Sequence, residues 1–370
     1  MRVGLVVEQV LSRVPGGTGR YTAEVAAALA ADAPRGASVT GWTAWHREVA
    51  TARVPGVRGP RRLPLPVRPL AAAWEVGVPL RPWAVDLVHA PTLLTPPASR
   101  RSALVVTVHD AVPWTHPETL TPRGVRWHRA MAARAAAQAD ALVVPTEAVA
   151  RELAVHLELR APVVVAGAGV SARLDRPDDA AERLARLGLG EGHLVTVATL
   201  EPRKGLDVLL QALALAPGRL PPLAVVGRPG WGGVEPVAMA RDLGLPEGAV
   251  RQLGGLSDAD LAAVLSAASV AVVPSRAEGF GLPVVEAMAA GVPVVTSDAA
   301  ALVEVGGGAT RVVPVGDVAA LSGALVELVA DRHHQEELRA AGLQRAGEFT
   351  WQAVARRLWS LYTDVLAQRG

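Results

Sequence analysis

Short apolar runs alternate with segments of helical length along the whole chain, and this alternation limits the fold more than any other feature. Each run is short enough to be a single strand, and the segments between the runs have the spacing of amphipathic helices. Strands that alternate with helices are typical of parallel sheets covered by helices on both faces. The pattern therefore predicts an α/β protein built on doubly wound sheets.

The predicted strands form two successive groups. The first group comprises Arg2–Val7, Ser38–Trp42, Leu87–His89, Leu104–His109, Ala141–Val144 and Val163–Ala166. The second group comprises His193–Ala198, Leu223–Gly227, Ala249–Leu253, Val270–Val273, Val292–Thr296 and Arg311–Val313. Two groups in a chain of 370 residues predict two Rossmann-like domains, at roughly 100 to 200 residues per domain.

We expect the first domain to span residues 1–167 and the second to span 180–350, with the linker in 167–179. The helical segment 351–370 is expected to cross back to the first domain. Ligands of doubly wound sheets lie at the carboxyl ends of the strands. Two such sheets facing each other predict a ligand cleft between the domains, lined by the loops that follow strands.

Composition narrows the chemistry. The chain has no cysteine, which excludes disulfides, thiolate metal sites and cysteine nucleophiles. It has 36 Arg but a single Lys, and only two Phe and two Tyr, as a G/C-rich coding bias would produce. Where a scarce residue type remains, we expect chemistry to require it. Lys204 and Phe280 are two such residues.

Charge is uneven along the chain. Residues 1–165 carry 19 Arg and 12 acidic residues, whereas the remainder carries more acidic than basic residues. A basic first half suggests an anionic partner. Nucleic acid is not expected, because no motif for it is recognisable. The basic and aromatic residues gather in two stretches: Arg58, Arg61, Arg62, Arg68, Trp74, Arg81 and Trp83, and then Arg123, Arg126, Trp127, Arg129 and Arg134.

These stretches have two interpretations. They can touch an anionic membrane or a lipid diphosphate, or they can be solvated surface that packs its own tryptophans. The start of the chain lacks the apolar stretch of a signal peptide, and no uninterrupted apolar run reaches 18 residues. We therefore expect a cytoplasmic protein, with peripheral contact at the inner face of the membrane as the alternative to a fully solvated one.

The segment Ser275–Val295 carries the strongest signal for a binding site. Gly279 and Gly281 permit a tight turn after a strand, and a helix is expected to begin near Leu282. The backbone N–H groups of Phe280, Gly281 and Leu282 would then form an anion site that suits a diphosphate. Glu278 and Glu286 are up to roughly 12 Å apart, so they would hold hydroxyls on different parts of a ligand rather than one atom.

Two segments of the second half resemble a known family. The Glu278-x7-Glu286 segment resembles the donor-binding motif of the retaining GT-B glycosyltransferases of family 4. The segment 198–213, ATLEPRKGLDVLLQAL, is similar to the strand, loop and helix of the same family in which an Arg and a Lys approach the donor diphosphate. The resemblance implies that Arg203 and Lys204 neutralise the leaving nucleoside diphosphate.

The same resemblance extends to other loops. The segment Arg13–Leu29 is similar to the first, glycine-rich loop of the family, where Gly16 and Gly17 would permit close approach of the donor. His109 follows a strand at the position where family members contact the donor sugar near the reacting centre. The resemblance also implies donor contacts at the ends of two further strands, by Gly227, Leu253 and Gly254.

No metal site is expected. Asp258 and Asp260 have the spacing of a metal-binding DxD motif, but Ser257 with Asp260 three residues later is typical of a helix N-cap. The adjacent histidines 333 and 334 have no cluster of further ligands near them in the sequence. The resemblance implies the same, because family members work without a metal or any other cofactor.

Three functions remain open. The resemblance implies a retaining, metal-independent transfer of a hexose from a nucleotide sugar to a glycan, lipid-linked or small-molecule acceptor, with polysaccharide biosynthesis as the setting. GDP-mannose is the favoured donor and UDP-glucose the rival. A nucleotide-sugar epimerase of similar two-domain fold is one alternative. A non-catalytic nucleotide-sugar binding protein is the other.

Overall fold

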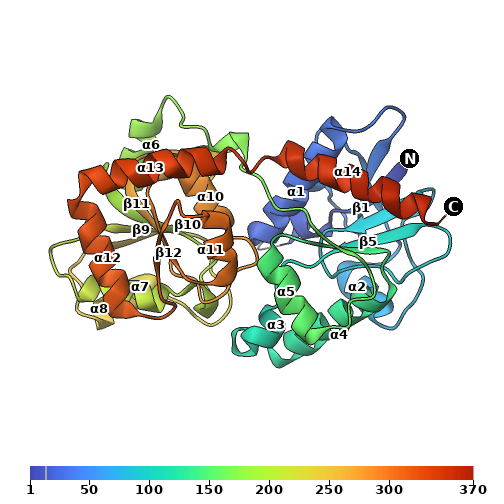
Figure 1. Ribbon diagram of the computed structural model, residues 1–370, viewed down its shortest axis with the longest axis horizontal. Coiled ribbons are helices and arrows are strands. Elements are labelled where there is room, and N and C mark those ends of the chain that lie inside the picture. The colour runs from blue at the N-terminus through green and yellow to red at the C-terminus, as the bar shows by residue number, and fades with distance from the viewer. Residues whose placement is uncertain (13–14, 370) are drawn as a thin grey trace. The chain divides into compact units, whose positions relative to one another are not determined.

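The computed structural model describes residues 1–12 and 15–369, apart from the side chain of residue 172. The chain divides into two compact units (Figure 1). The first unit is Met1–Gly169 with Thr350–Gly370, and the second is Val170–Phe349. The first unit thus ends just beyond residue 167, where we placed the end of the first domain. Most of the expected linker belongs to the second unit, and the C-terminal helix belongs to the first.

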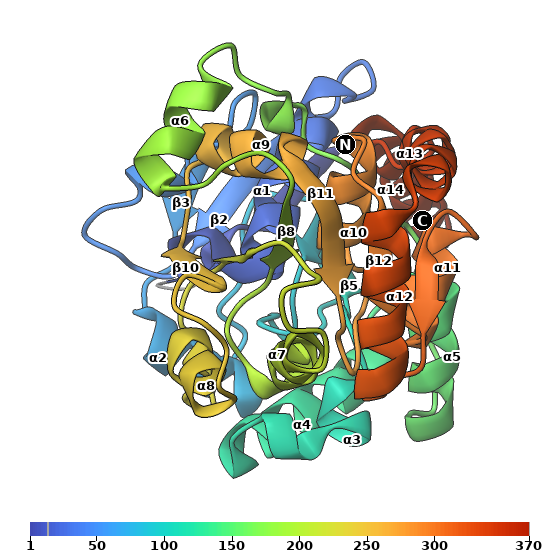
Figure 2. The same ribbon diagram turned by 90° about the vertical axis from the view of Figure 1, so that its left-hand side faces the viewer.

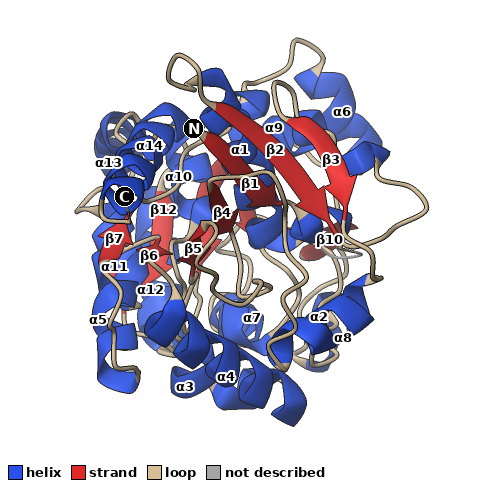
Figure 3. Ribbon diagram, turned by 90° about the vertical axis from the view of Figure 1, so that its right-hand side faces the viewer, coloured by secondary structure: helices blue, strands red, loops and turns tan. Residues whose placement is uncertain are grey.

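The first unit contains a seven-stranded parallel sheet (Figure 3). Its strands are β1 (Arg2–Val6), β2 (Ser38–Thr43), β3 (Arg58–Arg62), β4 (Leu87–Ala90), β5 (Ala103–Thr107), β6 (Ala141–Val144) and β7 (Val163–Val165). Their order in the sheet is β3-β2-β1-β4-β5-β6-β7. Its helices are α1 (Gly16–Ala31), α2 (Val67–Glu75), α3 (Val112–Thr115), α4 (Pro122–Gln138), α5 (Glu147–His156) and α14 (Trp351–Ala367).

The sequence did not predict β3, and its residues explain why. The strand reads RGPRR, with exposed arginines and no apolar run, and it forms one edge of the sheet beside β2. An edge strand needs apolar residues only where it meets the core, and charged residues on an edge discourage pairing with other chains. A strand of this kind gives no periodic hydrophobic signal.

The second unit contains a six-stranded parallel sheet (Figure 2). Its strands are β8 (His193–Val197), β9 (Leu223–Val226), β10 (Val250–Gly254), β11 (Ala268–Val273), β12 (Val294–Ser297) and β13 (Arg311–Val313), in the order β10-β9-β8-β11-β12-β13. Its helices are α6 (Ala180–Leu187), α7 (Leu206–Ala214), α8 (Pro236–Asp242), α9 (Asp258–Ser266), α10 (Leu282–Ala289), α11 (Ala300–Gly306), α12 (Val318–Ala330) and α13 (Arg332–Ala346). All twelve predicted strands are present across the two units.

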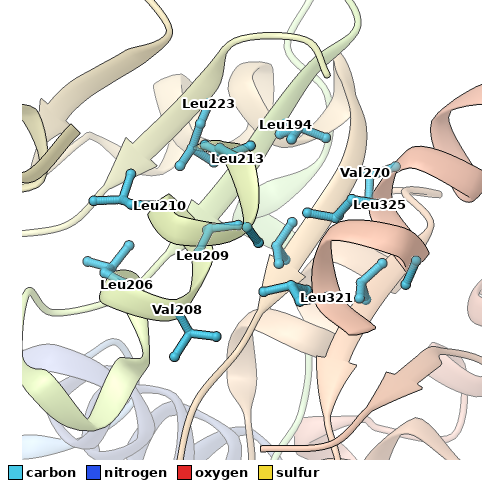
Figure 4. Packing of buried hydrophobic residues seen from close by; sticks show 14 of the residues in the cluster. Leu194, Leu206, Val208, Leu209, Leu210, Leu213, Leu223, Val270, Leu321 and Leu325 are labelled. Carbon is cyan, nitrogen blue, oxygen red and sulfur yellow. The ribbon is translucent and has the colours of Figure 1, made fainter. Parts of the chain in front are cut away.

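Leucine and valine side chains form the core between this sheet and its helices (Figure 4). Leu209 and Leu213 of α7 and Leu325 of α12 pack against Leu194 of β8 and Val270 of β11. Fully burying one such side chain contributes about 1.5 to 3 kcal/mol. This core fixes β8 and β11 side by side, and the loops after these two strands carry the candidate site.

The C-terminal helix α14 is an integral part of the first unit. Its buried residues follow helical spacing, and the helix packs along α1 (Figure 1). Trp359 donates a hydrogen bond from its indole N–H to the carbonyl of Leu29, at 3.1 Å. At the start of the helix, the backbone of Trp351 lies so close to Gly169 that a Cβ at Gly169 would collide with it. Glycine is therefore required where the chain leaves the first unit.

Candidate functional site

The candidate site of the second unit lies where the strand order reverses. β9 and β10 extend the sheet on one side of β8, and β11 lies on the other side. The loops that follow β8 and β11 therefore leave neighbouring strand ends in opposite directions across the sheet, which is where doubly wound sheets bind ligands. The first loop contains Arg203 and Lys204, and the second contains Glu278. The structure brings these three predicted residues together.

A glycine holds the two loops in contact. Gly205 has φ +67°, and a Cβ at this position would collide with the backbone carbonyl of Pro274 in the other loop. The backbone N–H of Arg276 donates to the carbonyl of Arg203 at 2.8 Å. The Arg276 guanidinium then reaches back to Asp207 with two hydrogen bonds of 2.9 and 2.6 Å. Backbone and side chains together thus fix the position of Lys204 relative to the second loop.

The Glu278 carboxylate is the centre of an ionic cluster. Its Oε1 accepts from Lys204 Nζ at 2.6 Å and from Ser275 Oγ at 2.7 Å. Its Oε2 accepts from Arg203 Nη1 at 3.2 Å. Arg203 also binds Glu201, with 2.6 Å between Nη2 and Oε1. Two cations and two carboxylates are therefore held in one contiguous group.

Burial and charge act against each other in this cluster. The side chains of Lys204 and Glu278 are only 13% and 8% exposed. Burial alone would raise the pKa of Glu278, but the charges of Lys204 and Arg203 and the hydrogen bonds from Lys204 and Ser275 outweigh it and lower that pKa to about 2. Burial, together with the positive charge of Arg203, lowers the pKa of Lys204, against the opposing effect of Glu278. The Glu278 carboxylate is thus ionised throughout the physiological pH range. The Lys204 ammonium is buried beside charged groups and is only partly hydrated.

Two cluster members are residues that sequence reasoning missed. Glu201 and Ser275 orient Arg203 and Glu278, yet each is an ordinary polar residue in a loop. The signal that could have found Ser275 is its position two residues after the end of β11 and three residues before Glu278. We also expected Arg203 and Lys204 to face an anion and Glu278 to face a hydroxyl, whereas in the structure the cations contact Glu278 directly.

The N-terminus of α10 adjoins this cluster in sequence. As predicted, the helix begins at Leu282, and Gly281 precedes it with φ +92°, where a Cβ would collide with Leu302. Gly281 provides no side chain to cap the first N–H groups of the helix. Phe280 is buried with its ring edge-on to Phe349, 5.5 Å between centroids. Glu286 lies in the second turn and is buried rather than solvated.

Three further predicted donor-binding residues lie at strand ends of the same sheet. Gly227 follows β9, and its N–H donates to the carbonyl of Gly254, the last residue of β10, at 2.8 Å. A Cβ at Gly227 would collide with the carbonyl of Ala198, so this strand end abuts the loop that leads to Lys204. Leu253 is partly buried in β10. The structure thus groups Gly227 with Gly254 and with the β8 loop.

The remaining predicted residues, Gly16, Gly17 and His109, belong to the first unit. Gly16 and Gly17 lie in the first turn of α1, not in a loop, because the helix begins at Gly16. The start of this motif, at residue 13, lies outside the described residues. Gly19, which is buried, comes so close to Pro15 that a Cβ there would collide with the proline ring. Glycine at position 19 therefore allows Pro15 to pack closely against the first turns of α1.

β5 ends at Thr107, so His109 lies two residues beyond the strand that we predicted to extend to it. Its Nε2 is 2.7 Å from the carbonyl of Pro91, which follows the neighbouring strand β4. The ring of Tyr21 meets it edge-on, 4.9 Å between centroids. Burial lowers the pKa of His109 below its ordinary value, although Pro91 and Asp110 act in the opposite direction. The imidazole is therefore neutral at physiological pH.

The predicted helix cap is confirmed. Ser257 Oγ accepts from the backbone N–H of Asp260 at 3.1 Å, at the start of α9. The Asp260 carboxylate pairs with Arg183 at 2.7 Å, and the neighbouring Asp258 pairs with Arg173 at 3.8 Å. Both carboxylates of the DxD-like sequence are thus engaged by arginines.

Two family models match the chain. The model described as "Glycosyltransferase Family 4" matches residues 15–173, and the model described as "Glycosyl transferases group 1" matches residues 191–331. The first match lies almost wholly in the first unit and the second lies within the second unit.

Curated relatives are similar over part of the chain. An O-antigen chain mannosyltransferase B from Escherichia coli is 32% identical over 165 residues, which is 44% of this chain and 43% of the relative. A D-inositol 3-phosphate glycosyltransferase from Frankia alni is 36% identical over 219 residues, 55% of this chain and 54% of the relative. The chain therefore spans about half the length of the curated relatives it matches.

Solved structures match over the whole chain. A sucrose-phosphate synthase from Thermosynechococcus elongatus superposes with a TM-score of 0.77 at 22% identity, covering 100% of both chains. HepE from Anabaena, solved in complex with UDP-glucose, has a TM-score of 0.71 at 19% identity and covers 98% of this chain and 100% of its own. At these identities the likeness concerns the fold, and it confirms the predicted class of two Rossmann-like α/β domains.

Proposed function

The chain belongs to the group 1 glycosyltransferases of family 4, and from this premise we propose that it transfers a hexose from a nucleotide-diphosphate sugar to a glycan, lipid-linked or small-molecule acceptor. One observation carries the proposal. Lys204 and Arg203 lie at the strand reversal of the second sheet, held by Glu278 only a few residues before an uncapped helix N-terminus. Cations and backbone amides of this kind suit a diphosphate.

The proposed role of this group is to stabilise the leaving nucleoside diphosphate. Glu278 takes up one of the three N–H donors of Lys204, and the others would bind phosphate oxygens. The N–H groups of Phe280, Gly281 and Leu282 would bind the same diphosphate. These donors are held in place before the reaction, so they need no reorganisation as negative charge develops.

Glu278 and Glu286 are proposed to hold hydroxyls, Glu278 on the sugar and Glu286 on the ribose. Glu278 is locked in ion pairs with a pKa of about 2, which does not suit a general acid at neutral pH. Retaining glycosidases instead use two carboxylates about 5 to 5.5 Å apart across one bond. We propose retention by a different route, in which the departing phosphate oxygen takes the acceptor proton on the side that the diphosphate leaves.

We propose that transfer needs no divalent metal, because Lys204, Arg203 and the α10 amides supply the positive charge. His109 is proposed to accept a hydrogen bond from a hydroxyl of the donor sugar as a neutral imidazole, because its Nε2 donates to Pro91. Gly227, Leu253 and Gly254 are proposed to contact the nucleotide, and Gly16 and Gly17 to let the donor approach the first helix.

GDP-mannose is the proposed donor and UDP-glucose its rival. Two kinds of relative support mannose, the O-antigen chain mannosyltransferase B and the serotype-specific mannosyltransferase WbdA of Escherichia coli. UDP-glucose is supported by the Anabaena protein solved with that ligand.

A thermal-shift panel of GDP-mannose, GDP, UDP-glucose and UDP tests the donor first. A ligand at 100 times its Kd stabilises the folded state by about 2.7 kcal/mol. We expect the largest shift with GDP-mannose, unchanged by EDTA. Arg311→Met is the matched control, because Arg311 pairs with Glu327 on the surface of the same unit.

Transfer is then tested with the best donor and a panel of mannosyl acceptors, with NMR to assign the anomeric configuration of the product. Retained configuration without added metal supports the proposal. Epimerised donor in the absence of acceptor would instead identify an epimerase. Nucleotide binding with no sugar release to any acceptor would identify a binding protein.

The membrane contact proposed for the first unit involves fewer residues than the sequence predicted. Trp74 is buried, and its indole donates to the carbonyl of Leu80. Arg81 binds Ser102 at 2.8 Å, and Arg134 of the second stretch binds the carbonyl of Thr95 at 3.1 Å. These residues serve packing. None of the described helices combines the length and apolar character that a bilayer-spanning segment needs.

An exposed group remains at the edge strand β3, consisting of Arg58, Arg61, Arg62 and Trp83. The Cζ atom of Arg61 lies 5.7 Å from the centroid of the Trp42 ring, and the ring centroids of Trp83 and Trp42 are 4.3 Å apart. We propose that this group touches anionic lipid. Co-sedimentation with phosphatidylglycerol vesicles should exceed that with phosphatidylcholine, and replacing the three arginines with Gln should abolish the difference. Equal sedimentation of both proteins would reject the contact.

A further inference from the structure

Both tyrosines of the chain lie in one buried polar network of the first unit. Tyr362 on α14 is hydrogen-bonded to Nδ1 of His89 on β4, at 2.6 Å. Thr107, the last residue of β5, is hydrogen-bonded to Nε2 of the same imidazole, at 2.8 Å. The Thr107 side chain also lies near Tyr21 on α1, where it opposes the rise in the pKa of that phenol. Four side chains thus connect α14, β4, β5 and α1.

Burial keeps the members of this network neutral. It lowers the pKa of His89 to about 3, an effect that the nearby His109 reinforces. It raises the pKa of Tyr21 to about 12 and also raises that of Tyr362. A neutral imidazole has one donor and one acceptor nitrogen, so one of its two hydroxyl partners must donate and the other must accept. The hydrogen bond between Tyr362 and His89 and the one between His89 and Thr107 therefore set each other's direction.

Tyr21 connects this network to His109. Its ring meets the imidazole of His109 edge-on, with 4.9 Å between centroids and an interplanar angle of 86°. The ring of Trp351, the first residue of α14, packs edge-on to the ring of Tyr21, with 5.6 Å between centroids. On the His109 ring itself, Nε2 must donate to Pro91, because a backbone carbonyl only accepts. Neutral His109 therefore has its acceptor at Nδ1, and Tyr21 limits the rotation of the ring.

We propose that Tyr21 is a positioning residue for His109, and that α14 holds Tyr21 in place through Tyr362, His89 and Thr107. This inference rests on the proposed function, in which His109 contacts the donor sugar. According to this proposal, Trp351 and Tyr362 of the C-terminal helix hold Tyr21 in place. Tyr21 in turn holds the ring of His109. Asp110, next to His109 in the chain, and His89 are the titratable groups that influence the imidazole.

Three substitutions separate positioning from packing. Tyr21→Leu removes both the ring contact with His109 and the hydroxyl, and it should lower kcat by about 100-fold, the effect of a displacement of about 1 Å near a reacting group. Tyr21→Phe keeps the ring and should restore most of that loss. Tyr362→Phe removes the hydroxyl at the far end of the network and should lower kcat less than Tyr21→Leu does. In each case the KM for the donor should change less than kcat.

The matched control is Arg369→Gln. Arg369 holds the C-terminal end beyond α14 through Asp140, at 2.6 Å, and through the carbonyl of Ser99, at 3.0 Å. This variant loosens helix docking without touching the network. It should lower the melting temperature with kcat unchanged, whereas Tyr362→Phe should change kcat.

NMR of the histidine side chains gives a readout that does not require activity. With ¹⁵N-labelled histidine, and with His109→Gln to assign the signals, the wild-type protein should show His109 protonated at Nε2 with a depressed pKa. Tyr21→Leu should raise that pKa towards its ordinary value and mix the tautomers. Unchanged NMR signals and kcat in Tyr21→Leu would overturn the inference. Altered signals in a protein that transfers no sugar would instead overturn the proposed function and leave the positioning of His109 supported.

Discussion

The two units share one strand order over six strands but hold their candidate residues in opposite electrostatic states. In both sheets the strand order reverses beside the first strand of the unit, β1 or β8. In the second unit, Lys204 and Arg203 keep buried Glu278 ionised. In the first unit, burial keeps His89 and His109 neutral. The same place in a fold therefore supplies either fixed charge or neutral hydrogen-bonding groups, depending on whether opposite charges compensate for burial.

This difference matches the two tasks of the proposed reaction. A leaving diphosphate carries charge and needs cations that are already in place. A sugar hydroxyl is neutral and is oriented by directional hydrogen bonds, which a fixed neutral imidazole provides. The comparison between the units can therefore be tested by removing charge from one and adding it to the other.

Removal of the lysine should have the largest effect. Lys204→Met takes away a cation that contacts Glu278 at 2.6 Å, and we expect kcat/KM to fall by about 100- to 1,000-fold. The free energy of unfolding should also fall, by about 3 kcal/mol, because a buried carboxylate loses a partner. Steady-state kinetics and urea denaturation measure the two effects.

The double variant with Lys204→Met and Glu278→Gln separates stability from activity. Without a charge at residue 278, most of the lost stability should return, while activity should remain low because the diphosphate still lacks its lysine. Recovery of activity in the double variant would show that the lysine serves only to neutralise Glu278.

The two units should lose stability at different pH values as the pH is lowered. The folded-state pKa of His89, about 3, lies below its ordinary 6.5, so the unfolded chain binds the proton more readily and stability falls as the pH drops below 6.5. The pKa of Glu278, about 2, lies below its ordinary 4.5, so its contribution is lost only below pH 4.5. Each group contributes about 1.4 kcal/mol per pH unit within its own window.

Hydrogen exchange at pH 7 and pH 5 measures this difference. We expect amides of β4 and β5 to lose protection, by about 2 kcal/mol, while amides of β8 and β11 change little. His89→Gln removes one of the two buried imidazoles and should reduce the response of the first unit, leaving the part that His109 contributes. Earlier loss of protection in the second unit would contradict the comparison.

The sequence predicted the sheets better than the site, for physical reasons. A strand buried on both faces must be apolar, so β4, β5 and their counterparts are visible as short runs. The edge strand β3 is hidden because its arginines face solvent. Lys204 and Glu278 were identified by scarcity and by a family motif, and the structure places them 2.6 Å apart.

The rest of the site could not be predicted, because it depends on contacts between loops or between distant segments. Ser275 and Glu201 are common residue types in loops, where no periodicity marks them. His89 lies within an apolar run, and its partner Tyr362 is 273 residues away in sequence. The scarcity of tyrosine was an available signal, the same that identified Lys204. The scarcity of tyrosine singles out Tyr362, but it does not identify His89 as the partner.

The smallest predicted effect concerns helix termini, and it extends the comparison to the ends of helices. α4, α5 and α9 begin with Thr121, Thr146 and Ser257, whose side chains cap the first turn. α7 and α10, which follow the two loops of the ionic cluster, begin after Gly205 and Gly281, which have no side chain to offer. Capping by a side chain satisfies N–H groups that a ligand could otherwise bind.

Ser257→Ala should therefore cost about 1 kcal/mol of stability and leave transfer unchanged, because it uncaps a helix whose Asp258 and Asp260 pair with arginines. Urea denaturation and an assay with and without added Mn²⁺ or Mg²⁺ check both parts. If the variant kept its stability but lost activity that a divalent metal restored, Asp258 and Asp260 would be metal ligands after all. The positive charge that stabilises the diphosphate would then come from a metal ion as well as from Lys204. The second unit would still differ from the neutral first unit, but part of its charge would belong to the ion.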